Sequence, residues 1–471
     1  MEQRVMSTFR SAAKTIIPSS MRPVVSGLYN TVYDRSLVLK ANADYYRRDR
    51  PRVTIEADAP DHVILIVVDA MRGDVVSSET TPFLHSMSGT LQAVSPAPWT
   101  FPAVTSIFTG QYPHEHGAMR QSDDPDLAAS GQLPPKLLAN TTLLTDYFAG
   151  SGYETYAGFG FPMPLYAVGG TFKKHCLYRD STPTSESDCK DILSDYLSWI
   201  ESHKESKTFA YLHIGDLHSP LNPPEEYWDK YDVEQSIENI EHWDYESGGS
   251  SEDAERYKNH KIRLYKAAVN YVDTELEQAL AQIKDLVGEN TAVVVTSDHG
   301  ELFWDQDRLD AKYFYDHREY SSLGHGGTPY EGVTRVPILG ENIEFPDQPL
   351  SLVDLKELLL EEVGISDRSE ITRLRDQKED KSRILLTEAA RYGYEKKSVV
   401  TDKWKLIVSR GDGHQLGFKL PEEETADLPE NIENQLKEAL PEWPGGKKSG
   451  EMNEISRTAK RRLKNLGYMK E

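Results

Sequence analysis

The chain contains several apolar runs in which polar and apolar residues do not alternate. Residues 63–68 are a continuous, mostly β-branched stretch, the pattern of a strand buried on both faces of a parallel sheet. Residues 209–214 and 291–297 are further β-rich runs, and residues 263–287 carry apolar side chains at helical spacing directly before the last run. Alternating helices and strands predict an α/β fold with a mostly parallel central sheet flanked by helices.

A different pattern begins near residue 376. Residues 398–409 resemble a hairpin with Asp402-Lys403 at its turn, which predicts a small antiparallel C-terminal sheet, and residues 421–459 read as loop with a short helix. We therefore divide the chain into a basic arm (1–52), a catalytic α/β domain (53–375) and a C-terminal subdomain (376–471). Residues 228–262 and 303–323 look inserted, and either form a lid that sets substrate choice or are plain surface loops.

The first candidate chemistry combines a carboxylate and a hydroxyl. Asp69 ends the run 63–68, at the sheet edge where α/β proteins bind ligands. Thr100 lies just ahead of Pro102, where a helix is expected to start, and the amides and dipole of a helix N-terminus favour an anion or an ionised hydroxyl beside a cation. The alternative is that Thr100 is only a helix cap and Asp69 only a turn former.

Further metal-ligating side chains follow the other strands. Asp298 and His299 come at the end of the run 291–297 and suit Zn²⁺ or Mn²⁺ better than Ca²⁺ or Mg²⁺. Asp216 and His218 follow the run 209–214 and, two residues apart, are expected to face one site. His325 lies in a glycine-rich loop, where a single histidine is usually a surface residue, but here it completes a set.

As an ordered set, these segments resemble the sulfatase-like branch of the alkaline phosphatase superfamily. The matching pieces are residues 67–72, 109–117 and 297–301, the Asp216/His218 turn, and His325 ahead of residues 335–337. Residues 400–407 and 463–468 look similar to the closing subdomain and tail of the family, so the resemblance spans residues 60–471. It implies an alkaline-phosphatase-like fold and a metal-dependent enzyme.

Departures from the family pattern change the expected chemistry. Sulfatases carry Cys or Ser at the nucleophile, followed by Pro and then Arg, whereas this chain has Thr100, Pro102 and Val104. Threonine cannot become the formylglycine aldehyde, because its extra methyl group would give a ketone. The resemblance is therefore closer to the phosphodiesterases and the phosphoethanolamine and lipoteichoic acid transferases that use a Thr nucleophile, which favours phosphate esters, and phosphodiesters in particular.

This resemblance implies one divalent ion held by Asp69, Thr100, Asp298 and His299, with Thr100 forming a covalent intermediate. Two roles stay open for His218 and His325 with Asp216: a second metal site, or hydrogen bonding and acid catalysis at the leaving group. The expected substrate is an anionic ester, either a small molecule or one linked to a glycan or lipid. Two other functions stay open, a sulfuric ester hydrolase without formylglycine and a non-catalytic binding protein.

Amino-acid composition limits the classes of partner and the cellular location that we expect for this protein. With 53 Lys and Arg against 76 Asp and Glu, the 471 residues carry a net charge of −23, which argues against nucleic acid as a partner. Such acidity fits either a high-salt cytoplasm or an ordinary acidic enzyme. Two cysteines make no disulfide framework, and we expect neither a secretory signal nor a membrane span, hence a cytoplasmic protein.

The first 52 residues differ from this acidic average. They hold ten basic and four acidic side chains, a net charge of +6, and their apolar residues recur at roughly helical intervals. A basic amphipathic segment of this kind either makes a peripheral membrane contact or packs along the catalytic domain.

Overall fold

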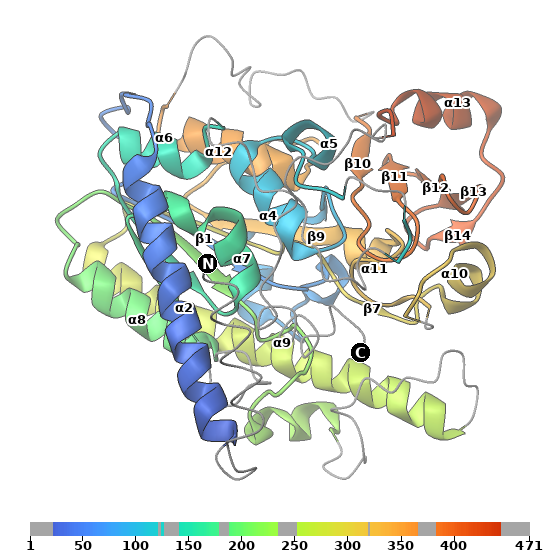
Figure 1. Cartoon of the computed structure of the whole chain (residues 1–471), viewed down its shortest axis with the longest axis horizontal. Coiled ribbons are helices and arrows are strands. Elements are labelled where there is room, and N and C mark those ends of the chain that lie inside the picture. The colour runs from blue at the N-terminus through green and yellow to red at the C-terminus, as the bar shows by residue number, and fades with distance from the viewer. Residues whose placement is uncertain are drawn as a thin grey trace, which may run out of the picture.

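A seven-stranded sheet lies at the centre of the described part of the computed structural model, in the order β2-β9-β6-β1-β5-β3-β4 (Figure 1). Its strands are β1 (His62–Val68), β2 (Ser88–Val94), β3 (Glu154–Phe159), β4 (Lys174–Leu177), β5 (Thr208–Ile214), β6 (Thr291–Thr296) and β9 (Arg335–Glu341). Strand β1 pairs in parallel with β5 and β6, and β9 runs antiparallel to its neighbours β2 and β6. The three apolar runs of the sequence therefore lie side by side, with their carboxyl ends at one edge.

The structure describes residues 22–120, 124–126, 141–178, 188–233, 252–318, 321–365 and 383–443, with side chains from residue 35 onward in the first range and from 254 in the fifth. Several predicted features fall outside these ranges. They are the start of the basic arm (1–21), most of the first inserted stretch (234–251), two residues of the second (319–320), the boundary at 375/376 and the tail 463–468.

Helices cover both faces of the sheet. The α-helices of the described residues, including those outside these two layers, are α2 (Arg22–Arg47), α3 (Pro82–Ser86), α4 (Thr100–Thr109), α5 (Pro113–His116), α6 (Leu144–Gly150), α7 (Pro162–Val168), α8 (Cys189–Glu201), α9 (Glu252–Val287), α10 (Asp307–Tyr313), α11 (Glu331–Thr334), α12 (Leu355–Glu362) and α13 (Glu430–Glu438). The predicted helix 263–287 is the C-terminal part of α9, which begins eleven residues earlier than expected.

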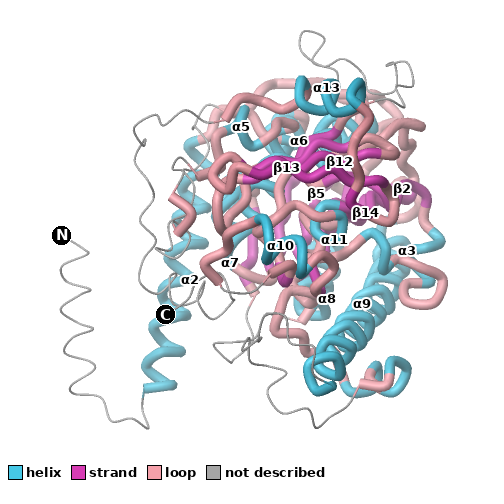
Figure 2. The backbone as a smooth tube through the Cα atoms, turned by 90° about the vertical axis from the view of Figure 1, so that its right-hand side faces the viewer, coloured by secondary structure: helices cyan, strands magenta, loops and turns pink. Residues whose placement is uncertain are grey.

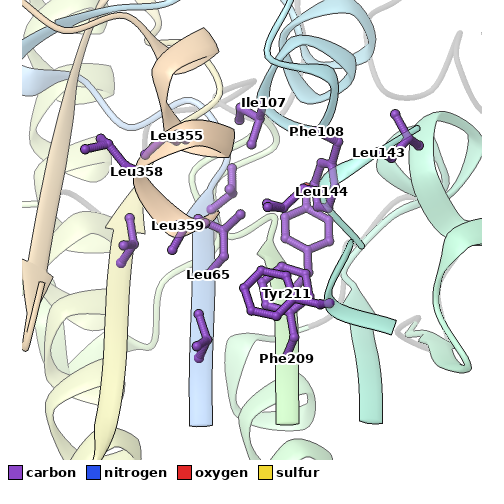
Figure 3. Close-up of a cluster of buried hydrophobic side chains, with 14 of the residues drawn as sticks. Leu65, Ile107, Phe108, Leu143, Leu144, Phe209, Tyr211, Leu355, Leu358 and Leu359 are labelled. Atoms are coloured by element: carbon purple, nitrogen blue, oxygen red, sulfur yellow. The ribbon is translucent and has the colours of Figure 1, made fainter. Parts of the chain in front are cut away.

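Alternate residues of β1 pack into two separate apolar cores, one on each face of the sheet. Leu65 belongs to a buried cluster shared with α4, α6, α7 and α12, whereas Ile66 belongs to a cluster shared with α8 and α9. Figure 3 shows the first cluster, in which Phe209 and Tyr211 of β5 lie below Phe108 of α4. Burial on both faces explains why the strand sequence shows no polar alternation.

The C-terminal region forms the predicted small antiparallel sheet. Its strands, in consecutive order, are β10 (Leu385–Thr387), β11 (Lys396–Val400), β12 (Trp404–Ser409), β13 (His414–Lys419) and β14 (Glu424–Thr425). Helix α13 lies over β12 and β13 (Figure 2) and buries Leu436 against this sheet. A two-stranded sheet of β7 (Leu302–Phe303) and β8 (Leu323–Gly324) joins the two ends of the second inserted stretch. The α/β fold class with a C-terminal antiparallel sheet is confirmed.

Helix α2 contains the described part of the predicted arm. Its C-terminal end contacts the body of the protein, since Ala41 is buried and the Val38 carbonyl lies 3.1 Å from Nε2 of His175. Directly after the helix, Arg48 forms an ion pair with the buried Asp146. Leu39 and Tyr46 are exposed. None of the described helices has the length and apolar composition needed to cross a bilayer.

Candidate active site

Asp69 extends from the end of the central strand. It is fully buried, and its amide donates to the Ile214 carbonyl of β5 at 2.9 Å. The chain then turns through Ala70 at φ 62°, a left-handed conformation that costs energy for a residue other than glycine. The turn is held by two contacts, from the Tyr265 hydroxyl to the Ala70 carbonyl at 2.8 Å and from the Met71 amide to Ser297 Oγ at 2.9 Å. Asp69 is thereby fixed at the sheet edge.

Asp298 and His299 follow the neighbouring strand β6. Gly300 is needed next, because a Cβ atom there would lie 2.1 Å from the Gly332 carbonyl oxygen. Nδ1 of His299 lies 2.8 Å from the Gly300 carbonyl, so this nitrogen is assigned as the donor. The assignment leaves Nε2 of His299 with a lone pair, which is the form that binds a cation.

Thr100 is the first residue of α4. The N-cap position belongs to Trp99, so the helix starts two residues before the predicted start at Pro102 and Thr100 is not its cap. The Thr100 hydroxyl donates to Oδ2 of Asp69 at 3.1 Å and lies 3.3 Å from Nε2 of His299. The structure thus brings an alcohol from α4 to the carboxylate of β1 and the imidazole of β6.

These side chains fit a divalent cation. Ligand atoms of Asp69, Asp298 and His299 all lie within 4.8 Å of one another, and the three residues are fully buried. Oδ1 of Asp69 and Oδ2 of Asp298 are buried without a hydrogen-bond partner among the described residues. Buried, unbonded carboxylate oxygens are costly unless a cation compensates them. Two oxygens and an imidazole nitrogen suit Zn²⁺ or Mn²⁺.

The two carboxylates differ in their pKa values. Burial raises the pKa of Asp298, and the negative charge of Asp69 raises it further. Burial acts on Asp69 as well, but the His299 charge and a hydrogen bond from His213 outweigh it and lower the pKa of Asp69. The pKa of His299 is raised, because the charges of Asp298 and Asp69 exceed the effect of burial. Asp69 is therefore the carboxylate that stays ionised most readily.

Two more imidazoles join this group. The His325 ring lies 4.5 Å from the His299 ring and 5.0 Å from the His218 ring, centre to centre. Nδ1 of His325 lies 2.8 Å from Oε2 of Glu301, and Nδ1 of His218 lies 2.9 Å from the Ser219 carbonyl. Burial lowers the pKa of His325 to about 4, against the opposing charge of Glu301.

Asp216 contacts another segment of the chain. Its Oδ1 accepts a hydrogen bond from the Cys189 amide at 3.1 Å, and it forms a separate group with Asp188 and Cys189 at the start of α8. Asp216 and His218, which were predicted to face one site, lie beyond the end of β5 at Ile214, and the His218 amide closes a turn onto the Gly215 carbonyl at 2.9 Å. Residues two apart in such a turn need not share a face.

One site residue was overlooked in the sequence. Nε2 of His213 lies 3.1 Å from Oδ2 of Asp69, and its Nδ1 lies 2.6 Å from the Tyr211 hydroxyl. Both residues are fully buried in β5. The signal was available, because a histidine inside an apolar run that pairs with the Asp69 strand needs a polar partner in the core.

The position of the sulfatase arginine is apolar. Val104 is fully buried and belongs to the core cluster that contains Ile107 and Phe108. Neither Lys nor Arg occurs between residues 96 and 110. The helix that presents Thr100 therefore brings no cationic side chain to the site.

A sequence model of the Sulfatase family matches residues 61–340. Solved structures share the fold at low identity. Phosphonate monoester hydrolase SpPMH from Silicibacter pomeroyi is 15% identical with a TM-score of 0.60, over 80% of this chain and 93% of that one. BT4656, solved with D-glucosamine-2-N,6-O-disulfate, is 12% identical with a TM-score of 0.59, over 87% and 98%. Among curated proteins, none matches the sequence.

A third structure was solved with a metal. The C-terminal periplasmic domain of EptC from Escherichia coli, in complex with Zn, is 15% identical with a TM-score of 0.50, over 70% of this chain and 92% of that one. The family match covers more than half of the chain, and the fold agrees with it. The chain is thus an enzyme that belongs to the Sulfatase family, within the alkaline phosphatase-like superfamily.

Proposed function

We propose that this enzyme is a metal-dependent hydrolase or transferase of phosphate esters, with Thr100 as the nucleophile. The observation that carries the proposal is the position of the Thr100 hydroxyl, 3.1 Å from Oδ2 of Asp69 and 3.3 Å from Nε2 of His299. An alcohol is a weak nucleophile unless a neighbouring base or cation activates it. Basic side chains and a set of cation ligands both lie beside the Thr100 hydroxyl.

The cation ligands in this proposal are Asp69, Asp298, His299 and the Thr100 oxygen. Bound there, a divalent cation lowers the pKa of the hydroxyl and offsets negative charge on the ester oxygens. The mixed oxygen and nitrogen donors favour Zn²⁺ or Mn²⁺, and the structural neighbour EptC was solved with Zn. We propose a single ion at this site, because Oδ1 of Asp216 accepts a hydrogen bond from the Cys189 amide.

The chain's own residues carry the chemical steps. With its pKa lowered, the Thr100 hydroxyl releases its proton to water as its oxygen forms a bond to phosphorus and the bond to the leaving oxygen breaks. Amides in the first turn of α4 lack acceptors within the helix and favour the anionic phosphoryl group. The product is a phosphothreonine, which water or an acceptor alcohol then cleaves.

His218 and His325 act on the leaving-group side in this proposal. Each has Nδ1 bonded to an acceptor, so Nε2 must take up a proton before it can donate to the leaving oxygen. Glu301 stays ionised, because its contacts with His325 outweigh burial and lower the pKa of Glu301. It fixes the orientation of His325.

The second candidate is a sulfuric ester hydrolase. It is favoured by the family match and by the likeness to BT4656, which was solved with a sulfated sugar. Thr100 opposes it, because threonine cannot supply the formylglycine aldehyde. The natural substrate we propose is an anionic ester, either free or carried on a glycan or lipid. A cytoplasmic location and a membrane contact of the arm stay predictions.

A substrate comparison tests the proposal. We expect turnover of nitrophenyl phosphate and bis-nitrophenyl phosphate with Zn²⁺ or Mn²⁺ to exceed turnover of nitrophenyl sulfate. Thr100→Ala should reduce it by about 10³-fold or more, while metal content stays near that of the wild type. Thr100→Ser is the matched control and should retain activity, with phosphate trapped on residue 100 detectable by mass spectrometry. Full activity of Thr100→Ala would remove Thr100 as the nucleophile.

A further inference from the structure

The loop between β10 and β11, residues 388–395, bonds to two segments of the active site. The indole Nε1 of Trp99, the residue before Thr100, donates to the Ala389 carbonyl at 2.8 Å. The Arg391 amide donates to the carbonyl of Gly326, the residue after His325, at 2.7 Å. One loop of the C-terminal sheet thus contacts both the segment that carries Thr100 and the loop that carries His325.

This loop has a fixed internal geometry. Oε1 of the buried Glu395 accepts hydrogen bonds from the amides of Ala389 and Ala390, at 2.8 and 3.2 Å. Oε2 of Glu395 accepts one from Nε of Arg120 at 3.2 Å. Ala389 has φ 66°, an unfavourable conformation for alanine that persists only where the surroundings impose it. The position of Arg391 is therefore set by the fold.

The guanidinium of Arg391 lies over the side chain of the residue that precedes the nucleophile. Its Cζ is 4.6 Å from the centre of the Trp99 ring, and the whole residue is 5% exposed. Trp99 shares a buried apolar cluster with Phe161, whose ring lies 5.6 Å from the His218 ring. A cation held on an aromatic face loses little further freedom when it binds a ligand.

A positive charge near the site would offset the negative charge of its carboxylates. Asp69, Asp298 and Glu301 are buried carboxylates, which repel an anionic ester. The nucleophile helix brings no compensating charge, since Val104 occupies the position of the sulfatase arginine. Guanidinium groups match phosphoryl oxygens with two parallel hydrogen bonds.

We propose that Arg391 is a substrate-binding residue that holds the non-bridging oxygens of the ester's anionic group, and that the C-terminal sheet thereby completes the active site. For phosphate as the bound group, this inference rests on the proposed function. It adds a residue from a separate subdomain to the strand-end ligands.

Inorganic phosphate is the probe. In the metal-loaded enzyme, Arg391→Gln should raise both the KM for nitrophenyl phosphate and the inhibition constant of phosphate by about 10- to 100-fold, the range for one charge-assisted contact. Arg391→Lys keeps the positive charge but cannot make two parallel hydrogen bonds. Its KM and its inhibition constant for phosphate should lie between those of the wild type and of Arg391→Gln. The matched control is Arg410→Gln, which removes an exposed arginine just after β12 and should leave both constants unchanged.

Direct binding separates this inference from the proposed function. Calorimetric titration of metal-loaded Thr100→Ala with phosphate, and separately with sulfate, reports oxyanion affinity without turnover. Loss of affinity on adding Arg391→Gln supports the inference even if the enzyme prefers sulfate esters. Unchanged affinity and KM in folded Arg391→Gln overturn it while leaving the proposed function intact. If Arg391→Gln fails to fold, Arg391→Lys decides, since unchanged phosphate affinity there overturns the bidentate contact.

Discussion

Replacing Asp298 with Asn should stabilise the metal-free protein. Oδ2 of Asp298 and Oδ1 of Asp69 are both buried without hydrogen-bond partners among the described residues. A carboxamide keeps the shape of the side chain, can still accept from the His299 amide at the position of Oδ1, and offers Asp69 a donor. It also removes one of two like charges.

The magnitude follows from the pKa of Asp298. Burial and then the Asp69 charge raise this pKa from 3.8 to about 6. A shift of about 2 units corresponds to about 3 kcal/mol. Because the folded-state pKa exceeds the unfolded value, the folded protein binds this proton more tightly. Protonation of Asp298 therefore stabilises the folded protein at low pH. This stabilisation is lost between about pH 4 and pH 6 and is absent at pH 8.

Urea unfolding with a chelator, at pH 5 and pH 8, measures the effect. We expect Asp298→Asn to exceed wild type by up to about 3 kcal/mol at pH 8 and by less at pH 5. Added Zn²⁺ should reverse the order, because wild type gains binding energy and the variant has lost a ligand. As a control, Asp354→Asn removes one of the two 2.8 Å bonds to Arg383 together with the charge of the ion pair, and should destabilise the protein with or without metal. A metal-free Asp298→Asn no more stable than wild type at pH 8 refutes the reasoning.

Two further predictions concern the support of the site. His213→Ala removes the contact to Asp69 and should weaken metal binding by about 10- to 100-fold in competition with a chelating dye, whereas Tyr211→Phe should have a smaller effect; equal affinity in His213→Ala contradicts this role. Gly300→Ala places a Cβ atom 2.1 Å from the Gly332 carbonyl and should cost about 3 kcal/mol in urea unfolding. Gly288→Ala, where the space is open but φ is +83°, should cost about 1 kcal/mol, and similar losses at the two positions would argue against a steric cause.

Much of the site could be predicted because it follows strand ends. Asp69, Asp298 and His299 each come directly after an apolar run, and the carboxyl ends of adjacent parallel strands meet at one edge. Thr100 was marked by the proline two residues later. The roles assigned to these residues stay predictions until they are tested. Asp216 and His218 follow a strand end as well, but they lie in a turn, and Asp216 accepts a hydrogen bond from the Cys189 amide.

His213 and Arg391 illustrate what was not predicted. His213 lies within an apolar run, which signals a need for a polar partner, but only the pairing of β5 with β1 shows that this partner is Asp69. Arg391 lies 291 residues beyond Thr100 in the sequence, in a loop with no recognised motif. Its contact with Trp99 depends on how the C-terminal sheet docks.

By itself, the sequence determined the local elements and the ligands at their ends, because hydrophobic periodicity and residue chemistry act over short stretches of chain. It indicated the buried parallel strands, the C-terminal sheet and the ordered motifs of the family. The tertiary structure alone decided which polar groups meet, which of the two carboxylates ionises more readily, and that Arg391 lies over the indole ring of Trp99, the residue before Thr100. Those outcomes depend on strand order and subdomain docking, which bring together residues that are far apart in the chain.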